Sequence, residues 1–149
     1  MREAIRLANE SVLNGGGPFG AVIVKDGEIV AESSNTVTID NDPTAHAEVN
    51  AIRKACKELG TFDLSGCVIY TSCEPCPMCL GAIYWAHLDR IYYGNTRKDA
   101  AEISFDDDFI YKEFAKPLSQ RLVPIMPLLG HEAISSFKLW NEKEDKTEY

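Results

Sequence analysis

Two short stretches of the sequence, PTAHAEVNAI and TSCEPCPMCLGAI, hold side chains that can bind a metal ion. The first places His46 and Glu48 two residues apart, and the second places Cys73, Cys76 and Cys79 three residues apart. Imidazole and thiolate groups are common zinc ligands in proteins. The sequence therefore predicts a zinc site, which either fills all four positions with protein or leaves one position open for chemistry.

The role of Cys73 separates these two alternatives. As a fourth ligand it would close a structural cage of three thiolates and one imidazole. However, Cys73 falls at the end of a predicted strand, so its direction is not set by the helix that carries Cys76 and Cys79. Glu48 would have no role in a closed cage, whereas beside an open metal it could take a proton from bound water and pass it to a leaving group. These features favour the open site, and the closed cage remains the alternative.

The ligands need two helices that begin at the same edge of a sheet. Cys76 and Cys79 lie one turn apart at the start of a predicted helix, where the helix dipole favours thiolates. His46 lies near the start of another predicted helix that opens at about Pro43. Residues two apart on a helix project in nearly opposite directions, so His46 and Glu48 require an irregular first turn.

The hydrophobic pattern predicts an α/β fold. Strand, helix and strand in succession imply a right-handed parallel crossover, and Asp26-Gly27 is a strong hairpin signal. We expect a three-layer α/β/α sandwich with a mixed five-stranded sheet. The predicted helices span about 2–13, 43–59, 77–87 and 131–141, the predicted strands span about 21–25, 28–33, 67–72 and 90–94, and a fifth, edge strand is expected within 121–129.

Length and composition indicate one globular domain over residues 1–149. Hydrophobic residues make up 45% of the chain and charged residues 26%, which is an ordinary balance for a folded domain. No apolar run reaches the roughly 20 residues of a membrane span, and the N-terminus lacks the apolar stretch of a signal peptide. We therefore expect a cytoplasmic protein that does not bind a membrane.

The charge and the cysteine count bear on partners. The formal net charge of -8, without a basic stripe, disfavours a nucleic-acid partner, because most of that affinity comes from phosphate contacts. A small neutral substrate fits this charge better. An odd number of cysteines, five, without a secretory signal indicates metal binding or free thiols instead of a disulfide framework.

The segments HAE and PCPMC together match the H-x-E…P-C-x-x-C signature of the zinc deaminases. With GGGPFGAVIVKDG ahead of them, the chain resembles the cytidine and nucleobase deaminase superfamily. This resemblance implies a cytidine deaminase-like fold and a zinc ion bound by His46, Cys76 and Cys79. It also implies that Glu48 is the proton shuttle and that Cys73 is a packed neighbour of the site.

Further segments, DAAE, FDD.FIYKE and a terminal Tyr149, are similar to guanine deaminases of the short bacterial type. The tRNA adenosine deaminases share the first half of the pattern but lack FDD.FIYKE. The resemblance implies guanine catabolism, in which hydroxide on zinc attacks the amino-bearing carbon of guanine and the products are xanthine and ammonia. The alternatives are another deaminase, acting on cytosine, cytidine or tRNA adenosine, and a structural zinc module without activity.

The same resemblance supplies candidates for contact with the base. Asn35 can donate and accept hydrogen bonds at once, and the resemblance favours it as a base-reading residue over the alternative of a turn-forming asparagine. Asp107 would accept the ring N–H of a free purine base, and otherwise it would belong to a solvated helix start. Ala47, between His46 and Glu48, is a further candidate.

Aromatic residues complete the expected site. Phe19 and Trp85 are candidates for stacking on the base, and core packing is the alternative for both. Tyr149 would cover the pocket, although such a charged tail is usually disordered. The proline-rich segment 123–130 could act as a stiff hinge that sends residues of about 131–149 onto a partner, which gives a homodimer with a swapped segment.

Overall fold

The computed structural model describes residues 1–149, which divide into two units, Met1–Ile110 and Tyr111–Tyr149. Helix α6 crosses the boundary between them. The first unit contains α1 (Arg2–Leu13), β1 (Gly20–Lys25), β2 (Glu28–Ser34), α2 (Val37–Asp40), α3 (Ala47–Leu59), β3 (Cys67–Cys73), α4 (Pro77–Trp85), β4 (Arg90–Asn95), α5 (Arg97–Glu102) and the start of α6 (Asp107–Ala115). The second contains the rest of α6, a short 3-10 helix η1 (Leu118–Gln120) and α7 (Gly130–Glu142).

The sheet of the first unit has the strand order β2-β1-β3-β4. Strand β1 is antiparallel to both β2 and β3, and β3 is parallel to β4, so the predicted mixed sheet is confirmed. The β1–β2 hairpin turns at Asp26 and Gly27, whose φ angles of 51° and 86° are the left-handed values that a two-residue hairpin loop requires.

The expected fifth strand is wrong: the sheet has four strands, and residues 121–129 form no strand. Pro124 and Pro127 interrupt this segment, and a proline has no N–H to give to a strand ladder.

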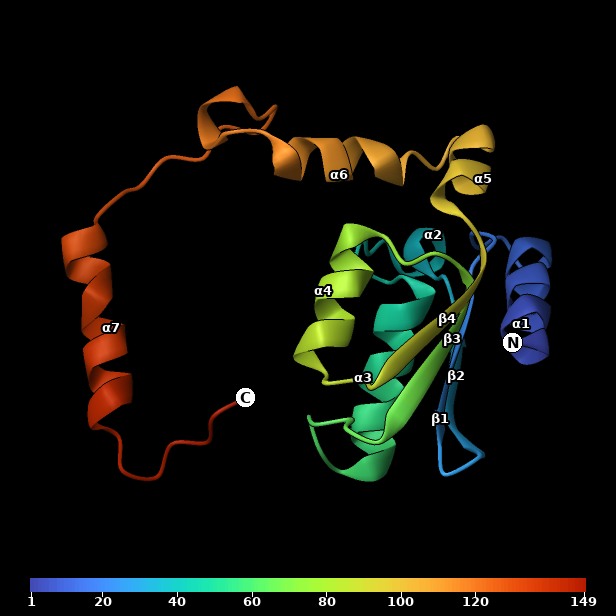
Figure 1. Ribbon diagram of the computed structural model, residues 1–149, viewed down its shortest axis with the longest axis horizontal. Helices are drawn as coiled ribbons and strands as arrows, with labels where there is room; N and C mark the ends of the chain where they lie inside the picture. Colours follow the sequence, from blue (N-terminus) through green and yellow to red (C-terminus); the bar gives the residue numbers. More distant parts are fainter. The chain divides into compact units, whose positions relative to one another are not determined.

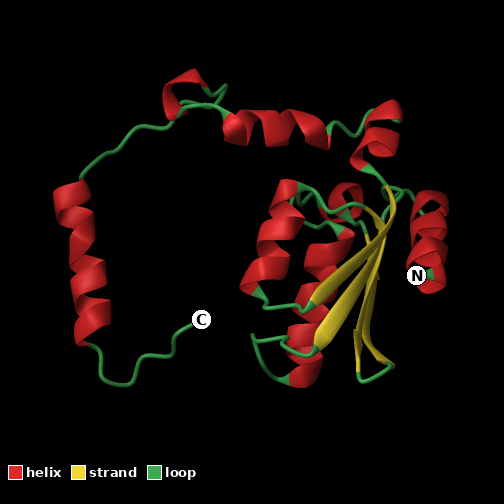
Figure 2. Ribbon diagram, viewed as in Figure 1, coloured by secondary structure: helices red, strands yellow, loops and turns green.

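Helices cover both faces of this sheet, with α1 on one face and α3 and α4 on the other (Figures 1 and 2). The buried residues of α3 include Ala47, Ala51 and Ala55, which pack in one cluster with Ile23 and Ile69 of the central strands. Small side chains let the helix lie close to the sheet. The three-layer arrangement predicted from the sequence is confirmed.

Helix α3 begins later than the sequence pattern indicated. The Asp42 carboxylate accepts hydrogen bonds from the backbone N–H and the hydroxyl of Thr44, both at 2.7 Å, so this stretch forms a turn. The helix then starts at Ala47, and His46 becomes its N-cap residue. The preceding segment contains the short helix α2, which the sequence pattern did not predict.

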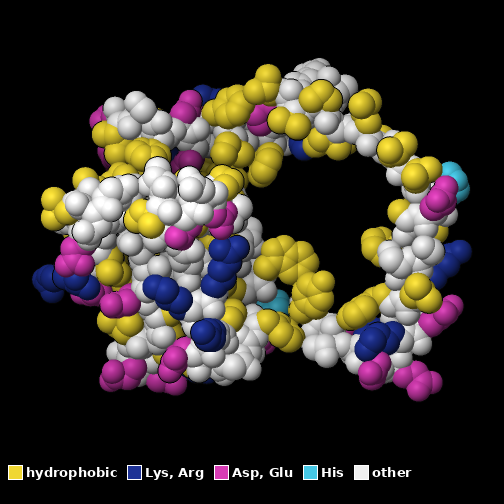
Figure 3. Space-filling view, turned by 180° about the vertical axis from the view of Figure 1, so that it is seen from behind, with side chains coloured by type: hydrophobic (Ala, Val, Ile, Leu, Met, Phe, Trp, Pro, Cys, Tyr) yellow, Lys and Arg dark blue, Asp and Glu magenta, His cyan; other side chains and the backbone are white.

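The second unit has little core of its own. Glu113 is the buried residue of α6, and its carboxylate accepts a hydrogen bond from the backbone N–H of Leu122 at 2.7 Å. No residue of α7 is buried, and hydrophobic side chains are visible along the surface of this unit in Figure 3. None of the helices in the structure has both the length and the apolar character needed to cross a membrane.

Candidate metal centre and active site

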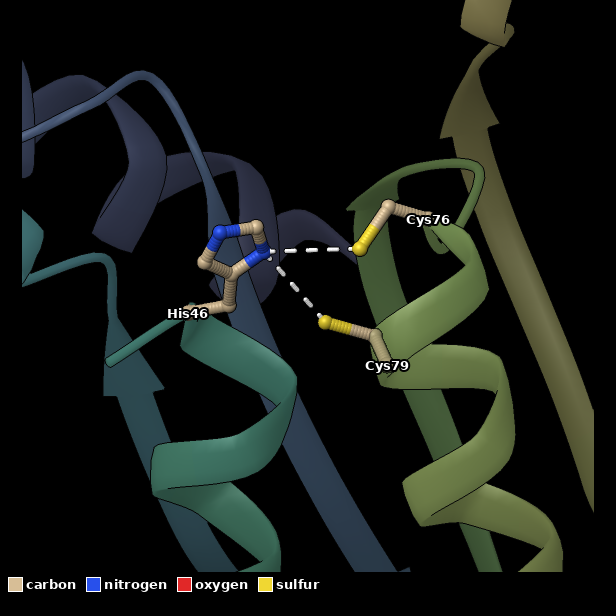
Figure 4. A group of neighbouring side chains, drawn as sticks. All are labelled: His46, Cys76 and Cys79. Atoms are coloured by element: carbon tan, nitrogen blue, oxygen red, sulfur yellow. Dashed lines mark hydrogen bonds between the residues drawn. The ribbon is translucent and has the colours of Figure 1, made fainter. Parts of the chain in front are cut away.

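Three ligand groups converge at one edge of the sheet (Figure 4). The His46 Nδ1 atom lies 3.6 Å from the Cys76 sulfur and 3.4 Å from the Cys79 sulfur, and the three ligand atoms lie within 4.8 Å of one another. A tetrahedral zinc with bonds of about 2.0–2.3 Å separates its ligands by about 3.5 Å. The donor types and their spacing therefore fit a zinc ion with three protein ligands.

The local backbone explains how these side chains meet. His46 and Cys76 are the N-cap residues of α3 and α4, with extended ψ angles of 154° and 167°. Because an N-cap residue lies outside the helical path, His46 and Glu48 need not project in opposite directions. Cys79 lies one turn into α4 and faces the same point. The irregular first turn expected from the sequence is thus a helix cap.

Electrostatics favour a thiolate in this cluster. The pKa of Cys76 is lowered to about 4 by the neighbouring Cys79 thiol and by the His46 ring. The same contact with Cys76 raises the pKa of Cys79 above its ordinary value, and the Cys76 sulfur also raises the pKa of His46. One sulfur is therefore anionic near neutral pH, as a metal ligand must be.

Glu48 lies beside the ligand cluster and is almost completely buried. Its Oε2 atom accepts a hydrogen bond from the Cys79 thiol at 3.4 Å. Burial raises the pKa of its carboxyl group, so Glu48 holds a proton more readily than an exposed glutamate does. This is the behaviour expected of a group that both accepts and returns a proton.

Cys73 is not part of the group that could hold a metal. Its thiol donates instead to the backbone oxygen of Thr96 at 3.7 Å, and burial raises its pKa to about 11. A neutral, hydrogen-bonded thiol is a packed neighbour of the site, which leaves three protein ligands and one position for another molecule.

A cavity of about 560 Å³ opens over the ligand cluster. Four sequence candidates outside the ligand set line it, namely Phe19, Asn35, Glu48 and Asp107. Burial raises the pKa of Asp107, and the Cys76 sulfur adds to this effect. The remaining lining residues are Val12, Gly15, Gly16, Gly17, Pro18, Val37, Thr38, His46, Glu74, Cys76, Ile103 and Phe105.

Three other sequence candidates do not line this cavity. Trp85 is the last residue of α4, and 67% of its surface is exposed. The side chain of Ala47 is fully buried in the core. Tyr149 belongs to the second unit, so its contact with the substrate stays a prediction.

Phe105 and Glu74 are among the cavity residues that sequence reasoning missed. The Phe105 ring contacts Phe19 edge-to-face at a centroid distance of 4.9 Å. Glu74 accepts a hydrogen bond from the backbone N–H of Arg97 at 3.0 Å, which joins the metal-bearing loop to the start of α5. The position of Glu74 in CEPC, between two of the spaced cysteines, was an available signal, and so was the position of Phe105 as the first residue of the segment FDD.FIYKE.

Comparison with known protein families matches residues 1–95 to the cytidine and deoxycytidylate deaminase zinc-binding region. The chain belongs to this deaminase family. It is therefore a zinc-dependent hydrolase, and its fold is cytidine deaminase-like, as the sequence predicted. The cofactor of the family is zinc, and the group formed by His46, Cys76 and Cys79 is suited to hold it.

Individual relatives show which deaminases this chain is similar to. The chain is 57% identical over 150 residues to guanine deaminase of Bacillus subtilis, an alignment that covers 100% of this chain and 96% of the relative. The crystal structure of guanine deaminase from Bacillus subtilis has a TM-score of 0.96 and covers 99% of this chain and 95% of that one. The tRNA-specific adenosine deaminase of Bacillus subtilis is 42% identical over 94 residues, 63% of this chain and 58% of the relative. The predicted resemblance to short bacterial guanine deaminases is confirmed.

Proposed function

We propose that this deaminase hydrolyses guanine to xanthine and ammonia. The observation that carries the proposal is the 57% identity to a guanine deaminase along the whole chain, including the part beyond residue 95. The adenosine deaminase that acts on tRNA matches a smaller share of the chain, at 42% identity. The segment beyond the shared signature is where the base specificities of the two groups would differ.

In this proposal His46, Cys76 and Cys79 hold the zinc ion. Their ligand atoms lie close enough together for one metal, and Cys73 bonds elsewhere. When bound, zinc makes a water molecule acidic enough to serve as the nucleophile near neutral pH.

Glu48 carries the proton in this proposal. It takes a proton from the water, gives it to a ring nitrogen of the base, and later supplies a proton to the departing ammonia. Its burial supports this role, because a raised pKa brings the carboxyl group closer to the pH at which it must work. One water and one guanine thus yield one xanthine and one ammonia.

The cavity walls favour a free base. The residues that line the cavity include neither lysine nor arginine, so no cation is available to bind a phosphate group. Asp107 would accept the imidazole-ring N–H of a free purine, which a nucleoside has replaced with its sugar. The apolar faces of Phe19 and Phe105 provide a surface on which a flat base can lie.

Asn35 and Ala47 would complete the recognition of the base. Asn35 is almost completely buried at the cavity. Its Oδ1 accepts the backbone N–H of Val37, the bond of an Asx turn, so its amino group is the part left to recognise the base. Ala47 would contribute its backbone N–H, since it is the first residue of α3 and the first N–H groups of a helix lack partners within the helix.

The test is ammonia release from a panel of guanine, guanosine, adenine, cytosine, cytidine and a tRNA anticodon stem. We expect guanine to be the preferred substrate and guanosine to be a poor one. Equal turnover of guanine and guanosine would contradict the role of Asp107. Preference for cytidine or for the tRNA stem would replace guanine with the corresponding alternative substrate.

We also propose that the protein is a cytoplasmic homodimer that acts on a small purine and not on nucleic acid. All five cysteines are free, as is usual where thiols are kept reduced. The exposed hydrophobic residues of the second unit support a partner surface there, with residues of about 131–149 swapped between subunits and with Tyr149 covering the pocket of the neighbouring chain. Stacking of Trp85 on the base stays a prediction. Light scattering after size-exclusion chromatography tests the dimer, and a monomeric mass would contradict it.

A further inference from the structure

Asn35 is held by its backbone and by its side chain. Its N–H donates to the backbone oxygen of Phe19 at 3.0 Å, and its Oδ1 accepts the backbone N–H of Val37 at 3.2 Å. The second bond fixes which end of the amide is oxygen, because the N–H of Val37 can only donate. No hydrogen bond within the protein uses the Nδ2 amino group, which therefore remains a donor for a ligand.

The backbone oxygen of Asn35 accepts a hydrogen bond from a residue that does not line the cavity. The donor is the hydroxyl group of Ser11, on α1, at 3.1 Å. Ser11 continues the buried stripe of α1 formed by Ala4 and Ala8, and 5% of its surface is exposed. A buried hydroxyl is costly unless it is bonded, and the partner of this one is the candidate base-reading residue.

The glycine-rich loop closes over this contact. The N–H of Gly16 donates to the backbone oxygen of Ser11 at 2.8 Å, and Thr38 ties the loop to α2 by donating its hydroxyl to the Gly15 oxygen at 2.8 Å. A Cβ atom on Gly16 would lie 2.4 Å from the Ser11 hydroxyl and 2.5 Å from the Asn35 oxygen. Only glycine can occupy this position without pushing Ser11 and Asn35 apart.

We propose that Ser11 is a positioning residue for base recognition. Its bond to the Asn35 carbonyl, enclosed by Gly16, fixes the backbone from which the Asn35 amide reaches the base. The inference rests on the proposed role of Asn35 in reading the substrate. A small displacement of such a group is expensive, because a hydrogen bond to the base needs both distance and direction.

The first test compares Ser11→Ala with Ser72→Ala. Ser72 is an equally buried serine whose hydroxyl also has a backbone partner, the N–H of Gly20 at 3.0 Å, and it does not line the cavity. Both substitutions remove one buried hydrogen bond, so both should lower the thermal midpoint. Ser11→Ala alone should lower kcat/KM for guanine by about tenfold, mainly through KM, because Asn35 contacts the base before and during reaction. Zinc content should stay at one ion per chain in both variants.

The second test is a double-mutant cycle with Asn35→Ala. This substitution removes the side-chain amide of Asn35 but keeps the backbone oxygen that accepts the hydrogen bond of Ser11. If Ser11 acts through the Asn35 side chain, Ser11→Ala should have little further effect on kcat/KM in the Asn35→Ala background, while its effect on the thermal midpoint persists. An equal fold-loss of kcat/KM in both backgrounds, or an equal loss in Ser72→Ala, would overturn the proposal and leave Ser11 a structural residue.

Gly16→Ala should displace Ser11 and Asn35 sterically and so weaken recognition of the base. It should raise KM at least as much as Ser11→Ala, whereas Gly81→Ala, where an added Cβ meets no atom within 4 Å, should leave KM unchanged. Unchanged KM in a folded Gly16→Ala variant would contradict the proposal.

A wrong proposed function can be distinguished from a wrong role of Ser11. If the function is wrong, the unmodified chain itself releases no ammonia from guanine. The cycle is then run on whichever base of the panel is turned over. Binding of 8-azaguanine, measured by calorimetry, reports recognition of the base without turnover. Binding that is equally tight in the Ser11→Ala variant and the unmodified chain would overturn the inference.

Discussion

The metal edge of the first unit and the second unit, Tyr111–Tyr149, differ in how their side chains are buried. At the metal edge, His46 and Cys76 are fixed by helix caps that rest on a buried core of alanine, isoleucine and leucine side chains. In the second unit, apolar side chains such as Leu128 and Phe137 are mostly exposed, and α7 buries none of its residues. The first region can position atoms on its own core, whereas the second buries too few side chains to do so.

This difference suggests that the first unit carries out the reaction and that the second unit covers the substrate. Binding a metal and moving a proton require a few side chains held rigidly, and the first unit contains all the candidates for these tasks. Covering the base and excluding water require a segment that can close. Substitutions at the metal edge should therefore abolish activity, and changes in the second unit should weaken it while the zinc site survives.

The largest effect is expected from Cys79→Ser. The variant loses a thiolate at the centre of the ligand cluster, and a serine hydroxyl is a poor replacement because it does not ionise near neutral pH. We expect loss of bound zinc, measured by metal analysis, together with loss of guanine turnover. Full retention of zinc would show that the metal edge is not organised around this sulfur.

Glu48→Gln should rank next. The amide has the same shape as the carboxyl group but cannot shuttle a proton, so we expect a loss of about 10² to 10⁴ in kcat. Zinc content and the circular dichroism spectrum should match those of the unmodified chain. Near-normal turnover in this variant would remove Glu48 from the proposed mechanism.

Deletion of residues 143–149 tests the other side of the comparison. If Tyr149 covers the pocket, guanine turnover should fall by about tenfold or more. Zinc should stay bound, because no candidate ligand lies in the deleted segment. Unchanged turnover would mean that this tail is solvated and encloses nothing.

The same contrast explains what the sequence could and could not predict. The start of α4, the Asp26-Gly27 turn and the spaced thiols depend on neighbours within a few residues, and their predictions agree with the structure. The start of α3 was predicted too early, because the turn at Asp42 and Thr44 precedes it. The fifth strand depended on a long-range partner that the sequence does not name, and its prolines disfavoured it. The contact between Phe105 and Phe19 could not be predicted from spacing, because only the path of the chain after α5 brings the two rings together.

Substitution of Glu74 should have a smaller effect on activity. Glu74 links the metal-bearing loop to the segment that leads to Asp107. Glu74→Ala removes the acceptor for the Arg97 N–H. We expect a several-fold loss of kcat/KM with zinc retained, whereas Glu74→Gln, which keeps an acceptor oxygen, should lose less. Glu58→Ala, on the exposed face of α3, is the control. Identical kinetics in the three variants would show that this link does not affect the site.

The smallest effect on activity is expected from Cys73→Ser, which separates the open site from a closed cage. The thiol bonds to the Thr96 oxygen and not to the ligand cluster, so zinc content and turnover should be unchanged. Loss of zinc would restore Cys73 as a fourth ligand and with it the structural cage.

Cys73 should nevertheless leave a mark on stability at high pH. Its folded-state pKa of about 11 exceeds the ordinary thiol value of 9.0 because burial disfavours the thiolate. Between these values the unfolded chain releases the proton and the folded chain keeps it, so the free energy of unfolding falls as pH rises. Denaturant titrations at pH 8 and pH 10.5 should show a smaller decline for Cys73→Ser than for the unmodified chain, because serine does not titrate in this range. Equal declines would mean that the Cys73 thiol ionises as readily in the folded protein as in water.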